Sequence, residues 1–145
     1  MKIRRSIIAA GAAVLLGGTG ALAIPAVASA HSATHTLKFT SVTVNSVQFT
    51  RASRALQDTD VNSKGKIIGF DDVNLTFTSM TSGTAAVAID VNGGFLYGTV
   101  TTTDSGKTFH GKVTGGTGAF TAATGSITGK AITSSKTAVT ITYST

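Results

Sequence analysis

The chain has 145 residues, a formal net charge of +6, one Pro and no Cys or Trp. The lack of Cys excludes a disulfide framework, thiol chemistry and a Cys-ligated zinc site. The cationic residues are scattered singly beyond the first five positions, so the sequence offers no basic stripe and predicts no nucleic-acid partner.

The first 30 residues are organised like an export signal. A cationic start at 2–5 precedes a Gly-, Ala- and Leu-rich run at 7–24, and Ala28 and Ala30 supply the small residues that signal peptidase recognises. We therefore predict a cleaved signal peptide over 1–30 and a secreted, extracellular protein with no membrane association after cleavage. A retained membrane anchor is the alternative, and the general secretory route fits better than the twin-arginine route.

Removal of this segment would leave residues 31–145, with nine cationic residues, six Asp and no Glu. The resulting charge is +3, and the length suffices for one hydrophobic core. Thr and Val are frequent and favour strands, while Gly favours the turns between them. We predict a flexible tail over 31–36 and a single all-β domain over 37–145.

Apolar and polar residues alternate along this domain with the period of a β-strand. The predicted strands are residues 36–50, 66–79, 84–91, 94–103, 107–114, 121–132 and 136–144, with one more possible around 51–57. Asn92-Gly93 separates two of them and is a typical hairpin turn. Sequential strands with tight turns and little edge protection favour a closed antiparallel barrel, and an open sandwich is the alternative.

A copper site at the new N-terminus is the less favoured interpretation of the first histidines. Cleavage after Ala30 would place His31 at the free amine, and a second imidazole from His35 or His110 could complete a copper-binding pair. The preferred interpretation is that cleavage falls by chance before a His in a frayed tail. His110 shares a strand face with polar residues and is expected to face solvent.

Asp71 is one of few candidates for acid–base chemistry, because the chain has no Glu. It has the same strand parity as Val73 and Leu75, which would direct its carboxyl to the apolar side and raise its pKa. The favoured interpretation is instead that 69–72 is a frayed strand start, with the carboxylates of Asp71 and Asp72 in water.

Two further carboxylates, Asp58 and Asp60, fall in a loop-like stretch at 57–65. They could line the mouth of a barrel, but simple solvation of a loop is favoured. Tyr97 lies in a predicted strand on the same face as Phe95 and is more readily interpreted as a wall residue than as a proton donor.

The most specific stretch, Phe109–Gly125, reads FHGKVTGGTGAFTAATG. It resembles the Gly-rich signature of dirigent proteins and of related secreted bacterial proteins with an allene-oxide-cyclase-like barrel. The resemblance implies an eight-stranded antiparallel, calycin-type barrel with an interior cavity and without a metal or organic cofactor. Plant members cyclise an epoxide or steer the coupling of phenolic radicals. It also implies structural turn positions for the glycines, which are Gly115, Gly116, Gly118 and Gly125.

The polar residues of that family are only partly present. Thr124 stands where many dirigent proteins have Arg, and Gly118 stands where some have an acid. Only the acidic stretch with Asp58 and Asp60 matches. The resemblance therefore implies the fold more directly than the reaction.

Three functions follow from this barrel. The first is binding of a small apolar or aromatic molecule in the cavity, and the second is a cofactor-free cyclase or isomerase, or a dirigent-type stereocontrol protein. The third is a structural or cell-surface protein with a filled barrel. The candidate catalytic residues are Asp58, Asp71 and Tyr97, and the candidate ligand-binding residues are Phe39, Phe77, Phe95 and Tyr97. Assembly into a homo-oligomer stays open.

Overall fold

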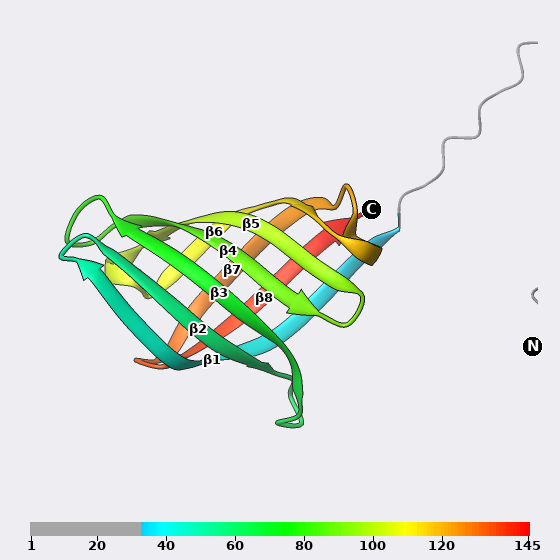
Figure 1. Ribbon diagram of the computed structural model, residues 1–145, viewed down its shortest axis with the longest axis horizontal. Helices are drawn as coiled ribbons and strands as arrows, with labels where there is room; N and C mark the ends of the chain where they lie inside the picture. The colour runs from blue at the N-terminus through cyan, green and yellow to red at the C-terminus, as the bar shows by residue number, and fades with distance from the viewer. Residues whose placement is uncertain (1–32) are drawn as a thin grey trace, which may run out of the picture. The chain divides into compact units, whose positions relative to one another are not determined.

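The computed structural model describes residues 33–145, so the predicted signal peptide with its cleavage residues Ala28 and Ala30 lies outside the described residues. The described chain is an all-β domain (Figure 1). Its strands are β1 (Thr34–Thr50), β2 (Ser53–Val61), β3 (Ile67–Phe77), β4 (Gly83–Val91), β5 (Gly94–Thr103), β6 (Thr108–Gly116), β7 (Thr124–Thr133) and β8 (Lys136–Ser144). No helix within residues 33–145 is long and apolar enough to cross a membrane.

Each strand pairs antiparallel with the next, and β8 returns to β1, which closes the barrel. Phe39 of β1 pairs with Val139 of β8 at this closure. Alternate residues of every strand face the interior, because successive side chains of a strand point to opposite faces of the sheet. The closed antiparallel barrel predicted from the alternation and the eight strands implied by the resemblance are thus confirmed, and the open sandwich is excluded.

The two ends of the barrel are built differently. At one end, tight turns join β1 to β2, β3 to β4 and β7 to β8, and a short 3₁₀ turn η1 (Asp104–Gly106) joins β5 to β6. At the other end, the β6–β7 connection contains a second 3₁₀ turn, η2 (Gly118–Phe120), whose Phe120 is buried. The Phe120 ring meets the Tyr143 ring edge-on, with 5.5 Å between the centroids. The η2 end is therefore closed by side chains.

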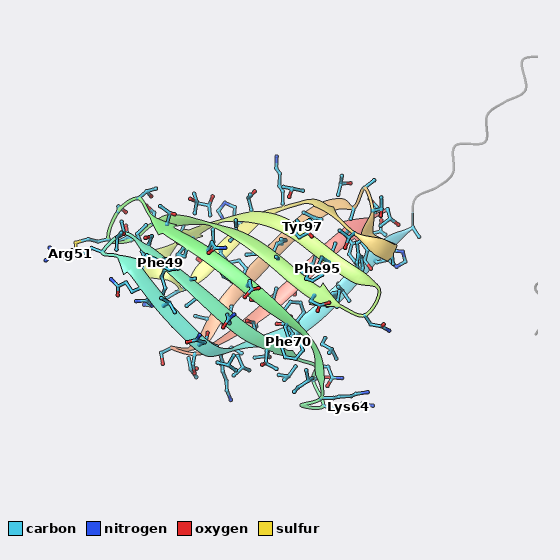
Figure 2. All side chains as sticks on the ribbon, in the orientation of Figure 1. Phe49, Arg51, Lys64, Phe70, Phe95 and Tyr97 are labelled. Atoms are coloured by element: carbon cyan, nitrogen blue, oxygen red, sulfur yellow. The ribbon has the colours of Figure 1, made fainter. Side chains whose placement is uncertain are left out.

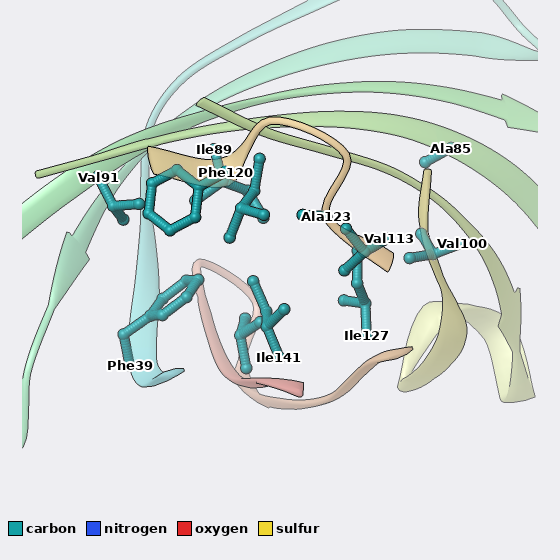
Figure 3. Close-up of a cluster of buried hydrophobic side chains, with 12 residues drawn as sticks. Phe39, Ala85, Ile89, Val91, Val100, Val113, Phe120, Ala123, Ile127 and Ile141 are labelled. Carbon is teal, nitrogen blue, oxygen red and sulfur yellow. The ribbon is translucent and has the colours of Figure 1, made fainter. Parts of the chain in front are cut away.

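The hydrophobic core lies inside the barrel (Figure 3). Its buried apolar members are Phe39, Ala85, Ile89, Val91, Leu96, Val100, Val113, Phe120, Ala123, Ile127, Val139 and Ile141. Leu96 and Ile141 are among the most completely buried side chains of the molecule. Burial of these side chains supplies the main driving force for folding, since the domain has no disulfide.

Two predicted boundaries were wrong in ways that matter for the site. Strand β1 begins at Thr34, which pairs with Ser144, so 34–36 are part of the sheet and not of a flexible tail. Strand β2 extends to Val61, four residues beyond the predicted end at 57. The stretch around Asp58 and Asp60 is consequently a strand and not a loop.

The Gly-rich segment closes the η2 end by close backbone contact. Gly118 has φ +59°, and a Cβ there would collide with the carbonyl oxygen of Gly93 in the β4–β5 turn. Gly115 and Gly116 are the last residues of β6. Gly125, expected in the turn, instead lies within β7, paired with Val113 and Tyr143.

Candidate functional site

The barrel encloses a cavity of about 150 Å³. Most of its lining is aliphatic or aromatic, and the polar side chains on it are carboxyls and hydroxyls. The lining residues are Phe39, Ser41, Leu56, Asp58, Asp71, Val73, Leu75, Ala85, Val87, Ile89, Val100, Thr102, Gly106, Phe109, Ile127, Thr137 and Val139. Because Gly106 is exposed and belongs to η1, the cavity reaches the surface at the end of the barrel opposite η2.

Two adjacent strands bring three carboxyl groups into the interior. Asp58 and Asp60 are two residues apart on β2 and therefore point to the same face. Asp71 of β3 pairs directly with Asp58, and Gly69 pairs with Asp60. The side chains are buried, with 7 % exposure for Asp58, 0 % for Asp60 and 7 % for Asp71. Asp58 and Asp71 line the cavity, whereas Asp60 lies one step further toward the η2 end.

Few hydrogen bonds compensate this burial. The Ser41 hydroxyl of β1 donates to Asp58 Oδ2 at 2.7 Å. Asp58 Oδ1, Asp71 Oδ1 and both oxygens of Asp60 have no hydrogen-bond donor within the described chain. A buried ionised carboxylate without a partner is costly, so the cluster favours protonation of some of its members.

The pKa values of two members follow this expectation. Burial and the charges of the neighbouring Asp71 and Asp58 raise the pKa of Asp60 to about 9. Burial and the charge of the neighbouring Asp58 raise the pKa of Asp71 to about 6. At neutral pH, Asp60 is therefore a neutral acid beside a largely ionised Asp71.

This arrangement gives Asp71 the properties of a general base. Its carboxylate lines an apolar cavity, one oxygen has no protein partner, and its pKa lies close to neutrality. A base of this kind combines a large ionised fraction at neutral pH with greater proton affinity than an ordinary Asp. The nearby Asp60 is neutral at this pH, and the Ser41 hydroxyl holds the adjacent Asp58 through a hydrogen bond to Oδ2.

The preferred sequence interpretations of these carboxylates were wrong. Asp71 was expected to face water with Asp72, but β3 begins four residues earlier, at Ile67, so Asp71 is in a regular strand and points inward. Of these two residues, Asp72 is the exposed one. Asp58 and Asp60 were expected to solvate a loop, but they alternate inward on β2.

The aromatic candidates separate into three groups. Phe39 lines the cavity as expected. Phe77 is half-buried at the end of β3 and lies outside the cavity lining. Phe95 and Tyr97 are 40 % exposed on the outer face of β5 (Figure 2). Their rings stack with 6.2 Å between centroids. Phe95 and Tyr97, two candidates for binding a ligand in the cavity, therefore lie outside it, and so does Tyr97 as a candidate proton donor.

The remaining imidazoles lie outside the cavity. His35 stacks on Tyr143 with 5.3 Å between the ring centroids, and His110 is exposed on β6, as expected. His31 lies outside the described residues. Within residues 33–145 there is no cluster of His, Asp and similar ligands with the geometry to hold a metal ion.

Three polar side chains at or beside the cavity are missing from the candidate site residues that the sequence indicates. Asp60 was assigned to a loop, and Ser41 and Thr102 were two among many hydroxyl residues. The alternation of Leu56, Asp58 and Asp60 was a usable signal for β2, because the three share one strand face. Nothing in the sequence distinguished Ser41 or Thr102 from the other Ser and Thr residues.

No family model and no curated protein matches this chain. Solved structures do match. A pyocyanin demethylase superposes with a TM-score of 0.63 at 18 % identity, covering 75 % of this chain and 99 % of that one. AbnU, an exo-specific intermolecular Diels-Alderase, superposes with a TM-score of 0.61 at 7 % identity, covering 78 % of this chain and 99 % of that one. These likenesses show a shared eight-stranded barrel fold.

Proposed function

We propose that this barrel binds a small apolar or aromatic molecule in its cavity and that Asp71 moves a proton on the bound molecule. The observation that carries the proposal is the position of a buried, partly unpartnered carboxylate on the wall of an apolar cavity. Pockets with an apolar lining and a few convergent polar groups are typical of small-molecule sites. The empty space also counts against a filled barrel with a purely structural function.

The size of the cavity limits its occupant. An apolar cavity of about 150 Å³ accommodates a molecule of the size of benzene. Phe39 and Phe109 supply aromatic surface on β1 and β6, and Val73, Val87 and Ile127 supply aliphatic surface. A single ring, or a chain of similar volume, therefore fits the space as it stands.

The proposed chemical step is balanced without a further reactant. Asp71 Oδ1 takes a proton from a C–H, O–H or N–H group of the bound molecule, and the electron pair of that bond stays on the molecule. The proton then returns from Asp71 to a different atom of the same molecule. The overall reaction is an isomerisation or ring closure, and the apolar walls keep water from competing for the proton.

Kinship with the dirigent and allene-oxide-cyclase-like barrels is part of this proposal. It is supported by the Gly-rich segment around Gly115, Gly116 and Gly118 and by the eight-stranded topology. The same fold occurs in two proteins named as enzymes, so it is compatible with catalysis. Secretion is likewise proposed, and its support is the signal-like organisation of residues 1–30.

The test is proton exchange on a one-ring probe. Cyclohexenone is incubated with the protein in D₂O, and deuterium incorporation at its acidic carbons is followed by NMR. We expect catalysed exchange in the wild type and at least a hundredfold loss in Asp71→Asn, which keeps the shape but removes the base.

The matched controls are Asp72→Asn, whose side chain is exposed on the same strand, and Tyr97→Phe on the outer face. Both should exchange like the wild type. Binding of cyclohexenone without catalysed exchange, or equal exchange in Asp71→Asn and wild type, would reduce the function to binding alone. Absence of binding would overturn the whole proposal.

A further inference from the structure

The cavity is chemically one-sided. Among residues 33–145, the lining contains no Lys, Arg or His, and its only titratable side chains are Asp58 and Asp71. The elements packed against these carboxyls add no positive charge: β1 contributes Ser41, β4 contributes Ile89, and β2 adds Asp60. The electrostatic environment of an occupant is therefore negative on one side and neutral elsewhere.

Two carboxyl oxygens on the cavity lining lack a donor. Within residues 33–145, Asp58 Oδ1 and Asp71 Oδ1 have no hydrogen-bond partner, although each side chain is more than nine-tenths buried. Buried acceptors in proteins are almost always satisfied, so an unpaired pair on a cavity wall indicates that something else supplies the donor. Each carboxylate oxygen can accept a hydrogen bond but, when ionised, cannot give one.

A further polar group, the Thr102 hydroxyl, lies elsewhere on the cavity lining. Thr102 on β5 is 8 % exposed, and its Oγ1 has no hydrogen-bond partner within the described chain. It pairs with Gly83 and Phe109 near η1, so it belongs to the end of the cavity that reaches the surface. An occupant therefore meets a hydroxyl near the entrance and acceptors deeper inside.

We propose that the cavity selects a one-ring molecule that carries a positively charged hydrogen-bond donor, such as a protonated amine, and that this donor binds Asp58 Oδ1 and Asp71 Oδ1. This inference rests on the proposed function, because it specifies what occupies the same cavity. Hydrogen bonds between a cationic donor and a carboxylate are shorter and stronger than neutral ones. An anion of the same size would meet unpaired negative charge and is excluded.

The test compares ligands of nearly equal size and different charge. Benzylamine (protonated at pH 7), benzyl alcohol, toluene and benzoate are titrated into the protein by calorimetry at low ionic strength. We expect benzylamine to bind at least tenfold more tightly than toluene, benzyl alcohol to fall between them, and benzoate not to bind. Toluene should displace benzylamine, which places both in one cavity.

Two variants distinguish binding of benzylamine in the cavity from its attraction to exposed carboxylates on the surface. Asp71→Asn removes a charge from the cavity and should lower the benzylamine-to-toluene affinity ratio toward one while toluene affinity stays unchanged. Asp72→Asn removes an exposed charge from the neighbouring position and should leave the ratio unchanged.

The outcomes distinguish the two proposals. If toluene binds as tightly as benzylamine, or benzoate binds equally well, the cationic ligand is overturned and the binding cavity survives. If none of the four binds at millimolar concentration, the cavity is not a site for one-ring molecules and both proposals fail. A preference for benzylamine that Asp71→Asn does not reduce also overturns the cationic site.

Discussion

Asp58 and Asp71 lie directly opposite each other on the neighbouring strands β2 and β3, and both carboxyls point into the barrel. Directly opposed side chains on one face of an antiparallel pair have Cβ atoms about 5 Å apart, and like charges there destabilise the sheet. The Ser41 hydroxyl on one side and a protonated Asp60 on the other reduce this repulsion. The properties of these four side chains lead to the first two predictions.

The stability of the protein should fall as the pH rises. The pKa of Asp60 is raised from 3.8 to about 9 and that of Asp71 to about 6, so the folded state holds more protons than the unfolded state above pH 4. The free energy of unfolding therefore decreases with pH, by roughly 1.4 kcal/mol per pH unit for each proton held. Between about pH 4 and 6 both Asp60 and Asp71 contribute to this decrease, and from there to about pH 9 only Asp60 does.

Urea denaturation at pH 5, 7 and 9 measures this dependence. Asp60→Asn puts an uncharged amide of the same shape in place of the titrating carboxyl, so the decline between pH 7 and 9 should largely disappear. Asp72→Asn, with its exposed side chain, should retain the wild-type slope. An equal slope in Asp60→Asn and wild type would contradict the raised pKa of Asp60.

Exchange catalysed by the protein should depend on the ionisation of Asp71. Since its pKa is about 6 and a general base acts as the carboxylate, the rate should rise with pH and level off near pH 7. At pH 5 the rate should be about tenfold below this plateau, in proportion to the ionised fraction. Deuterium incorporation into cyclohexenone at half-unit pH intervals gives the profile. A rate that increases as the pH falls would contradict this prediction and would show that the protonated form of Asp71 is the active one.

The fold could be predicted from the sequence because alternation is directly visible in it. Leu37 and Phe39, or Val139 and Ile141, alternate with Thr and Lys, and each pair is on an inward face. The turn at Asn92-Gly93 was equally clear and joins β4 to β5 as expected. These local patterns indicate seven of the eight strands and their order, and a barrel results when the last strand meets the first.

The site could be predicted only in part, because its signal contradicts the usual pattern. In β2 the inward positions carry carboxyls, which are rarely buried, so the strand resembled a polar loop. In β5 the inward positions are Leu96, Gly98 and Val100. The aromatic rings of Phe95 and Tyr97 suggest the opposite face as the inner one, but these rings lie outside. The side chains that stabilise or perturb these buried carboxyls, such as Ser41 for Asp58, come from other strands. The sequence alone does not show that they are neighbours.

Filling the cavity should abolish binding without unfolding the barrel. Ala85 is buried and lines the cavity, whereas Ala86 is exposed on the outer face of the same strand, so the two form a matched pair. Ala85→Leu should remove detectable toluene and benzylamine binding and change the free energy of unfolding by about 1 kcal/mol, since the added atoms enter existing space. Ala86→Leu should bind both ligands like the wild type. Calorimetry and urea denaturation of both variants check this, and undiminished binding by Ala85→Leu would place the ligand elsewhere.

Replacing Gly118 at the closed end of the barrel should cost more stability than its positive φ alone would explain. Gly65, in the β2–β3 turn, has φ +75° and open space where a Cβ would be, while Gly118 has φ +59° and the Gly93 carbonyl oxygen in that position. Gly65→Ala should therefore cost about 1 kcal/mol of unfolding free energy, which is the strain of a left-handed residue with a side chain. Gly118→Ala adds a displacement of the β4–β5 turn and of η2 with Phe120, and should cost about 3 kcal/mol. Equal losses in urea denaturation would mean that η2 does not depend on this close approach.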